Sequence, residues 1–114
     1  MIDCLFCKMV AGEINPATVY EDENILAFRD INPQAPLHVL VVPKEHISTL
    51  NELEDNHATL VGKLFLAAKQ IARQEGLAER GYRAVMNCNA EAGQSVYHIH
   101  LHLLAGREMR WPPG

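Results

Sequence analysis

Between residues 98 and 102 the chain alternates histidine with an aliphatic residue: His98, Ile99, His100, Leu101 and His102. Successive side chains of a β-strand point to opposite faces of its sheet, so this alternation predicts a strand with three imidazoles on one face. Neighbours on that face lie about 7 Å apart, a spacing that suits a small anion such as phosphate held between the rings. We expect the apolar side chains on the other face to pack against helices.

Two other interpretations of the three imidazoles compete with a phosphate site. A single histidine on a strand is usually a polar surface residue, but three that alternate with apolar residues lose hydration unless they have partners. The three histidines could instead hold a catalytic zinc ion. Ligands two residues apart on one flat strand converge poorly on a tetrahedral ion, so the phosphate site is favoured.

His100, in the middle of the run, is the predicted nucleophile. Imidazole has an ordinary pKa of about 6.5, so at neutral pH it is largely uncharged and nucleophilic without a strong base beside it. Attack on phosphorus would form a phosphohistidine whose cationic nitrogen leaves readily when water arrives, which splits one difficult displacement into two easier ones. A flanking imidazole could protonate an amine leaving group as a general acid.

Composition limits the kind of protein this can be. A chain of 114 residues, 48% of them hydrophobic, has material for one modest core, so we expect a single domain over residues 1–114. The net charge of −4 disfavours a protein that binds the backbone of a nucleic acid. The first residues do not resemble a signal peptide, no stretch is long enough to span a bilayer, and the three cysteines are an odd number. We therefore expect a cytoplasmic protein with reduced thiols.

Hydrophobic periodicity predicts an α+β fold with an antiparallel sheet and two helices. A short helix over about residues 4–11 would be capped by Asp3 and ended by Gly12, and a long helix over about 55–75 would be ended by Gly76. We expect both helices to pack against one face of the sheet. The predicted strands cover residues 18–20, 25–28, 37–42, 82–87 and 97–104.

Motifs along nearly the whole chain resemble one known family. Residues 31–38 read Ile-Asn-Pro-Gln-Ala-Pro-Leu-His, residues 93–98 read Gly-Gln-Ser-Val-Tyr-His, and residues 111–114 read Trp-Pro-Pro-Gly. With the alternating histidines of residues 98–104, these segments resemble the histidine triad (HIT) superfamily, and within it the Hint branch of purine nucleoside phosphoramidases.

The resemblance implies a HIT-like homodimer that hydrolyses purine nucleoside phosphoramidates and aminoacyl-adenylates. The products would be an amine and a nucleoside monophosphate such as AMP or GMP, formed through a nucleotidyl-histidine intermediate. No cofactor for catalysis, nucleic acid or membrane is expected. Two alternatives stay open: a dinucleoside polyphosphate hydrolase or nucleotidyl transferase, and a nucleotide-binding interaction module without catalysis.

The resemblance also implies roles for individual residues. His100 becomes the nucleophile, His38, His98 and His102 become the imidazoles that orient it and bind phosphate, and Ser95 lies beside the bridging atom. The residues implied to bind the nucleotide are Asn87 near the phosphate, Asp30 at the ribose, Leu5, Phe6, Met9, Phe28 and Ile31 around the base, and Gln94 and Trp111.

Several of these residues have a structural alternative. Ser95 and Asp30 could be turn residues, and Asn87 could satisfy a strand end. The apolar residues around the base would be ordinary core residues on composition alone. Trp111 is also a candidate contact across the dimer, because a large aromatic side chain at a proline-rich terminus usually docks somewhere.

Cys4 and Cys7 form a Cys-x-x-Cys pair on the predicted short helix. Two sulfurs on one helix face supply half of a tetrahedral zinc site. Resemblance to some histidine triad proteins and to galactose phosphate uridylyltransferases implies His46 and His98 as the other two ligands. Such a zinc would be structural, joining the helix to the sheet and leaving His100 free. The alternative is two reduced, partly buried thiols.

Overall fold

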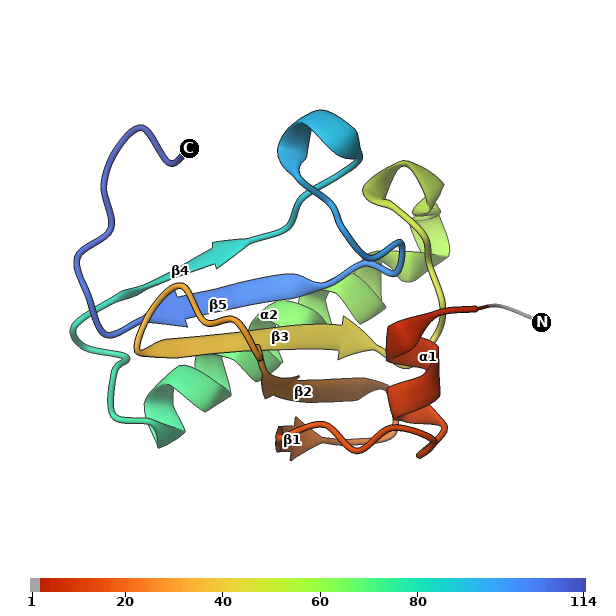
Figure 1. Ribbon diagram of the computed structural model, residues 1–114, viewed down its shortest axis with the longest axis horizontal. Helices are drawn as coiled ribbons and strands as arrows, with labels where there is room; N and C mark the ends of the chain where they lie inside the picture. The colour runs from red at the N-terminus through yellow and green to blue at the C-terminus, as the bar shows by residue number, and fades with distance from the viewer. Residues whose placement is uncertain (1–2) are drawn as a thin grey trace.

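Five strands form one antiparallel sheet in the order β1-β2-β3-β5-β4 in the computed structural model, which describes residues 3–114 (Figure 1). The strands are β1 (Thr18–Glu21), β2 (Ile25–Arg29), β3 (Leu37–Pro43), β4 (Tyr82–Val85) and β5 (Leu101–Ala105). The described residues also form the helices α1 (Leu5–Val10) and α2 (Ala58–Gln74) and the 3₁₀ turns η1 (Leu50–Glu52), η2 (Asp55–His57) and η3 (Ala90–Ala92). The predicted α+β class, with one long and one short helix, is confirmed.

Strand β3 lies at the centre of the sheet and is buried along its whole length. Its odd-numbered residues face α2, and its even-numbered residues, among them His38, face the other side. In the antiparallel register Leu40 lies opposite His102 of β5, and His38 lies opposite Leu104. His38 and His102 are therefore diagonal neighbours on the face away from α2.

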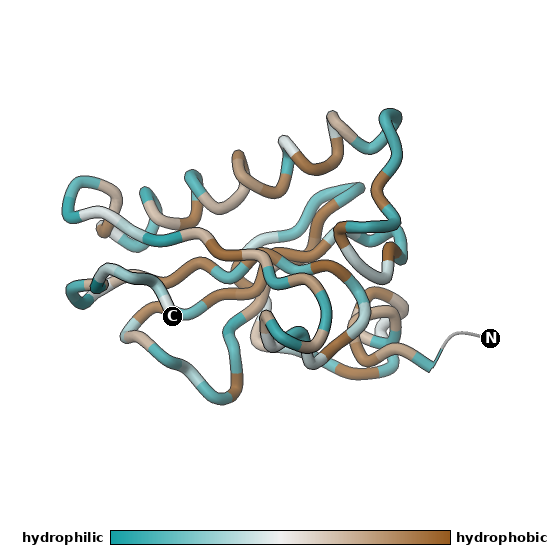
Figure 2. Tube along the Cα trace, turned by 90° about the horizontal axis from the view of Figure 1, so that it is seen from above, coloured by the Kyte–Doolittle hydropathy of each residue, from teal (hydrophilic) through white to brown (hydrophobic). Residues whose placement is uncertain are grey.

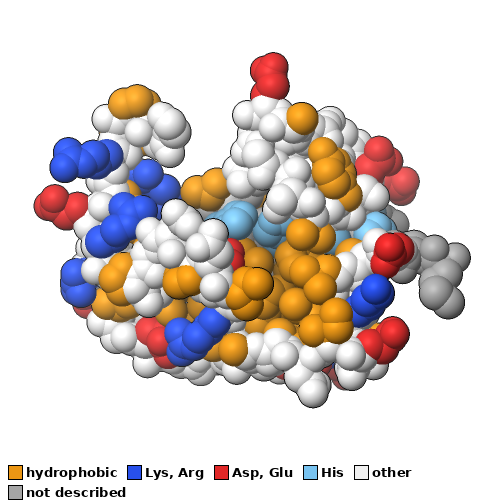
Figure 3. Space-filling model, in the orientation of Figure 1, with side chains coloured by type: hydrophobic (Ala, Val, Ile, Leu, Met, Phe, Trp, Pro, Cys, Tyr) orange, Lys and Arg blue, Asp and Glu red, His pale blue; other side chains and the backbone are white. Residues whose placement is uncertain are grey.

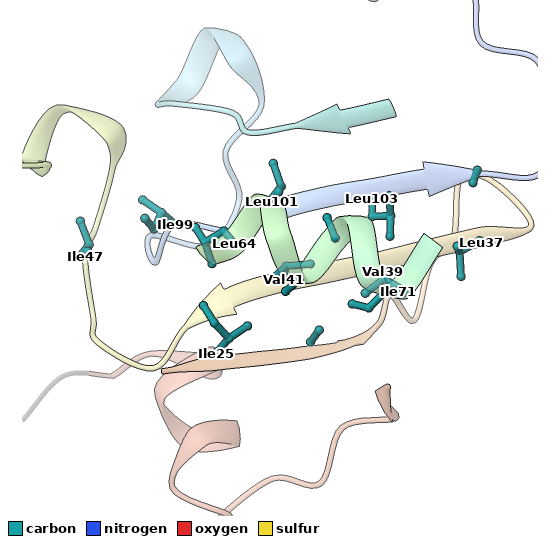
Figure 4. Close-up of a cluster of buried hydrophobic side chains, with 14 residues drawn as sticks. Ile25, Leu37, Val39, Val41, Ile47, Leu64, Ile71, Ile99, Leu101 and Leu103 are labelled. Atoms are coloured by element: carbon teal, nitrogen blue, oxygen red, sulfur yellow. The ribbon is translucent and has the colours of Figure 1, made fainter. Parts of the chain in front are cut away.

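The main core lies between the sheet and α2 (Figure 4). Helix α2 contributes buried residues at the i, i+3, i+4 and i+7 spacing of one helix face. Gly76, at φ +73°, follows the helix, and the Leu77 amide donates to the Ala72 carbonyl (3.0 Å), so the helix ends at the predicted glycine. The larger side chains of this core are Ile25, Leu37, Val39, Val41, Ile47, Leu64, Ile71, Ile99, Leu101 and Leu103.

The two helices cover opposite faces of the sheet, so the prediction that both pack on one face is wrong (Figure 2). Phe6 of α1 packs with Phe28 and Leu40 in a second, smaller apolar cluster on the face away from α2. The physical reason is that β2 and β3 are apolar on both faces, and a sheet of that kind needs cover on both sides.

Two predicted boundaries also differ from the structure. Strand β5 begins at Leu101 rather than at residue 97, because the Ile99 amide donates to the Ile47 carbonyl (2.8 Å) of a loop instead of joining the sheet. Helix α1 is capped by Cys4, whose sulfur accepts the Cys7 amide (3.5 Å). The Asp3 carboxylate pairs with Lys8 (3.1 Å) instead of capping the helix.

The remaining predicted ranges agree to within a few residues, with β4 ending at Val85 instead of residue 87. The predicted long helix over 55–75 begins as the 3₁₀ turn Asp55–His57 before α2 proper. Neither helix of residues 3–114 has the combination of length and apolar character needed to cross a membrane.

Replacing a buried residue of α2 should destabilise the fold far more than replacing an exposed one. Ile71 is 1% exposed and Leu66 is 62% exposed on the same helix. We expect Ile71→Ala to lower the free energy of unfolding by about 2–5 kcal/mol, because it leaves a cavity in the core. Leu66→Ala should change it by less than about 0.5 kcal/mol. Urea denaturation measures both, and equal losses would contradict the assigned core.

Candidate active site

Three of the four predicted imidazoles form a row on the face away from α2. His38 comes from β3, His102 from β5, and His100 from the segment just before β5. The ring centroids of His38 and His102 are 5.2 Å apart, and those of His100 and His102 are 5.0 Å apart. Figure 3 shows histidine side chains at the floor of a hollow, next to an apolar patch. The alternation along the chain thus places imidazoles on one face even where no strand forms.

Hydrogen bonds assign the proton positions of His38 and His102. The Gln34 amide donates to His38 Nδ1 (3.0 Å), so a neutral His38 carries its proton on Nε2. That nitrogen lies 2.9 Å from His102 Nδ1 and 3.4 Å from the Asp30 carboxylate. His102 therefore accepts at Nδ1 and carries its own proton at Nε2.

In His100, the ring nitrogen that carries no proton is Nε2. Its Nδ1 lies 2.8 Å from the His98 carbonyl, and since a carbonyl only accepts, His100 carries its proton on Nδ1. The lone pair is then on Nε2, which has no hydrogen-bond partner among the described residues. No side-chain nitrogen or oxygen in residues 3–114 is both fully buried and unpaired, so this Nε2 is accessible.

The row of imidazoles is neutral at neutral pH. Burial lowers the pKa of His38 and of His100 below the ordinary value, in both cases against the pull of the nearby Asp30 carboxylate. Burial lowers the pKa of His102 to about 4, and repulsion from protonated His100 and His38 adds to this effect. A neutral His100 has an unprotonated nitrogen with which it can act as a nucleophile.

A cavity of about 480 Å³ lies over His100 and His102. Its walls are mainly apolar side chains of α1, β2 and the loop before β1, and Asp30 and Ser95 supply polar groups. This arrangement suits a flat apolar group joined to an anion, with the anion at the imidazoles. The predicted residues that line the cavity are Leu5, Phe6, Met9, Phe28, Asp30, Ile31, Ser95, His100 and His102.

The structure also places residues in this cavity that the sequence analysis missed. Leu40 shares the cavity face of β3 with His38, and its even position in the strand was a signal that could have found it. No comparable pattern marks the loop residues. The other residues missed are Ile14, Asn15, Pro16, Ala17, Arg29 and Val96.

Five of the residues predicted to act in catalysis or to bind the nucleotide lie outside the lining of the cavity: His38, His98, Asn87, Gln94 and Trp111. His38 contacts the cavity through two residues that line it, His102 (2.9 Å) and Asp30 (3.4 Å), and Asn87 is half-buried in the segment after β4. The buried Gln94 amide accepts from the Asn89 amide (2.8 Å) and donates to the Ser48 carbonyl (2.8 Å), so it holds the loop that carries Ser95. Trp111 is 83% exposed and lines a different hollow of about 830 Å³, together with Arg80, Arg83, Arg107 and Arg110.

His98 belongs to a second cluster, with Cys4, Cys7 and His46. The four ligand atoms all lie within 4.8 Å of one another. Nδ1 of His98 is 3.4 Å from the Cys4 sulfur, 3.6 Å from the Cys7 sulfur and 3.2 Å from Nδ1 of His46. The Cys7 sulfur is 3.3 Å from the same His46 nitrogen. The structure therefore brings together all four predicted metal ligands.

These separations, 3.2–3.6 Å, are close to those between the ligand atoms of a tetrahedral zinc ion. Bonds of about 2.3 Å to sulfur and 2.0–2.1 Å to nitrogen place neighbouring ligand atoms about 3.4–3.8 Å apart. His98 Nε2 donates to the Pro43 carbonyl (2.7 Å), which leaves the Nδ1 lone pair directed at the cluster, as is usual for metal-binding histidines. Burial, and to a lesser extent the neighbouring Cys4, raises the pKa of Cys7 to about 11. A metal ion would have to displace that proton to bind the sulfur.

The interpretation of the alternating histidines as one catalytic zinc site does not fit this geometry. Nδ1 of His98 faces the cysteines, Nδ1 of His100 donates to a carbonyl, and Nδ1 of His102 faces His38. The three imidazoles therefore converge on no common centre. Each imidazole has a different partner at Nδ1, so the three imidazoles are not equivalent in their chemistry.

Comparison of the sequence and the structure with those of known proteins points to one family. The model of the family described as HIT domain matches residues 11–109. A solved structure of a HIT family hydrolase from Legionella pneumophila Philadelphia 1 superposes with a TM-score of 0.96 at 57% identity, covering 98% of this chain and 100% of that one.

Three relatives are about half identical to this chain. The 14 kDa zinc-binding protein of Zea mays is 53% identical over 96% of this chain and 87% of its own. The adenylylsulfatase HINT1 of Arabidopsis thaliana is 48% identical over 96% of this chain and 76% of its own. The purine nucleoside phosphoramidase of Escherichia coli K12 is 47% identical over 94% of this chain and 90% of its own. With these matches over nearly its whole length, the chain belongs to the HIT domain family.

Proposed function

We propose that this protein is a hydrolase of purine nucleoside phosphoramidates and aminoacyl-adenylates. The observation that carries the proposal is the unprotonated, accessible Nε2 of His100 at the floor of an apolar cavity. The purine nucleoside phosphoramidase of Escherichia coli, a relative at 47% identity, supports the same activity. The products are a nucleoside monophosphate and, from a phosphoramidate, an amine; an aminoacyl-adenylate, in which a P–O bond breaks, releases an amino acid instead.

In the first step, His100 Nε2 attacks phosphorus and forms a P–N bond to the enzyme. The imidazole becomes positively charged, and the His98 carbonyl stabilises it through the 2.8 Å hydrogen bond from Nδ1. The P–N bond of the substrate breaks, and its electron pair goes to the leaving amine, which takes a proton. The Ser95 hydroxyl, in the cavity wall, donates its proton to the amine and takes one from solvent, while Nε2–H of His102 donates a hydrogen bond to a phosphoryl oxygen.

In the second step, water attacks phosphorus and the P–N bond to His100 breaks. The electron pair returns to Nε2, and the proton that the water loses goes to solvent, where it replaces the one consumed in the first step. Two displacements at phosphorus replace one difficult hydrolysis. Because burial keeps His100 neutral, the lone pair is available again for the next cycle.

The nucleoside part of the substrate is proposed to lie against α1 and β2. Phe6 and Phe28, which pack edge-on against each other with ring centroids 5.4 Å apart, form part of the apolar wall against which the purine would lie. Asp30, which is partly exposed, accepts the ribose hydroxyls through its carboxylate. Asn87, half-buried after β4, is proposed to bind the phosphate, and Gln94 is proposed to act indirectly by holding the Ser95 loop.

We propose a homodimer in the cytoplasm as the working form. The exposed Trp111 at the C-terminal segment is the candidate contact with the second copy. The three cysteines are free thiols, which is consistent with a reducing compartment.

A second candidate function is hydrolysis of adenylylsulfate. The adenylylsulfatase relative of Arabidopsis thaliana, at 48% identity, favours it. The same attack by His100 would break a P–O bond, and sulfate leaves as an anion that needs no proton. A Ser95→Ala variant separates the two, because it slows a reaction that needs a protonated leaving group more than one that does not.

Removal of the nucleophile should abolish turnover. With adenosine 5′-phosphoramidate as substrate and release of the amine as the readout, we expect His100→Ala to lose on the order of 10⁴-fold or more in kcat/KM. His57→Ala is the matched control, since His57 pairs with Glu45 outside the cavity (2.9 Å) and should keep wild-type activity.

The other possible results of that experiment distinguish the proposed mechanism from the alternative functions. Equal activity of wild type and His100→Ala would overturn the proposed mechanism. AMP binding without turnover of phosphoramidate, adenylylsulfate or diadenosine polyphosphate would favour the non-catalytic interaction module. Turnover of the polyphosphate alone would favour the polyphosphate hydrolase.

The cysteine cluster is proposed to hold a structural zinc ion. The residues that would bind it are Cys4, Cys7, His46 and His98, and its role is to join α1 to the sheet. We expect about one zinc per chain by elemental analysis, and none in Cys4→Ser/Cys7→Ser. Cys88→Ser, which changes the free thiol outside the cluster, is the control and should keep the metal. Full zinc content in the double variant would rule this site out.

A further inference from the structure

Helix α1 takes part in two sites at once. Cys4, its cap residue, and Cys7, in its first turn, belong to the proposed metal-binding cluster, or metal cluster, of Cys4, Cys7, His46 and His98. Leu5, Phe6 and Met9 of the same helix line the cavity over the imidazoles. A displacement of this six-residue helix would therefore change both sites together.

Phe6 is the direct contact between the two sites. It lies between the two cysteines in the chain and is 2% exposed. Its ring centroid is 5.7 Å from that of His98, a member of the metal cluster, and 5.1 Å from that of His100, the proposed nucleophile. Both rings meet Phe6 edge-on, at interplanar angles of 76° and 82°. One side chain thus packs against a metal-cluster imidazole and the nucleophile.

His98 supplies a second connection through its own backbone. Its Nδ1 lies in the metal cluster, and its carbonyl accepts the hydrogen bond from His100 Nδ1 (2.8 Å). The next residue, Ile99, is held by the Ile47 carbonyl (2.8 Å), directly after His46 of the cluster. The position of the nucleophile therefore depends on the same segment that presents two metal-cluster imidazoles.

Helix α1 depends on these contacts for its order. A six-residue helix is far below the length at which isolated helices become stable, which is about 12–15 residues. It docks on the smaller apolar cluster and contributes no residue to the main core beneath α2. Part of the free energy of metal binding would consequently go into holding α1 in place.

We propose that zinc at the Cys4/Cys7/His46/His98 cluster and nucleotide in the cavity bind cooperatively, with Phe6 as the positioning residue that couples them. The proposal rests on the proposed function, because it requires a nucleotide in the cavity. Each ligand stabilises the docked position of α1 that the other needs. By thermodynamic linkage, zinc must raise the affinity for nucleotide by the same factor by which nucleotide raises the affinity for zinc.

The test measures both affinities on the full-length protein. Titration calorimetry gives the affinity for AMP in zinc-loaded protein and in protein stripped by a chelator, with circular dichroism to verify the fold. Competition with a chromogenic chelator gives the affinity for zinc with and without AMP. We expect the two factors to agree and to be about 5-fold or more. If stripping unfolds the chain, the transfer of zinc from loaded protein to the chelator, with and without AMP, decides the question.

A pair of phenylalanine variants tests the route of the coupling. Phe6→Leu keeps all four metal ligands and all imidazoles, and we expect the coupling factor to fall toward one while zinc still binds. Phe65→Leu is the matched control, because Phe65 lies on α2 and is 49% exposed. It should leave the factor at the wild-type value.

The outcomes separate this inference from the proposed function. Equal AMP affinity with and without zinc would overturn the coupling and leave the nucleotide site intact. No AMP binding in either state would overturn the proposed function and the coupling with it. Coupling of wild-type size in Phe6→Leu would overturn the role of Phe6.

Discussion

The hydrogen bond from His100 Nδ1 to the His98 carbonyl is the interaction on which the site depends. It fixes the proton of His100 on one ring nitrogen and leaves the other as an accessible lone pair. It also orients the ring, because an imidazole held at one nitrogen by the backbone of its own segment has little rotational freedom. The remaining features of the site, namely the neutral His102, the apolar cavity and the docked α1, act around this one nitrogen.

The two faces of the sheet differ in role: one forms the main core, and the other carries the imidazoles and the cavity. The face toward α2 is a conventional apolar core, and it holds β3 and β5 in register. That register places His38 and His102 as diagonal neighbours on the other face, where α1 and a row of loops leave a cavity open. Stability therefore comes mainly from one side of the sheet, while the smaller cluster on the other side positions the chemistry.

Local patterns predicted much of this architecture. The alternation of residues 98–102 correctly separated Ile99 and Leu101, which lie in the main core, from the imidazoles. The Cys4 and Cys7 spacing, with two histidines taken from the resemblance, correctly predicted that Cys4, Cys7, His46 and His98 lie together as a group that could hold a metal ion. What failed were non-local features. The face that α1 covers and the start of β5 depend on which distant groups pair, and no period in the sequence encodes this. The partners of the Gln94 amide are likewise visible only in the folded chain: the Asn89 amide of its own loop and the Ser48 carbonyl of a distant segment.

In the proposed mechanism, His100 Nε2 becomes covalently bonded to the nucleotide during turnover. The most direct measurement mixes the protein with adenosine 5′-phosphoramidate, quenches the reaction within milliseconds under alkaline conditions that preserve phosphoramidate bonds, and maps the modified peptide by mass spectrometry. We expect an adenylyl group on His100 that forms and decays at rates compatible with turnover. An adduct on His98 or His102 instead, or steady turnover with no histidine adduct at any time, would contradict the proposed mechanism.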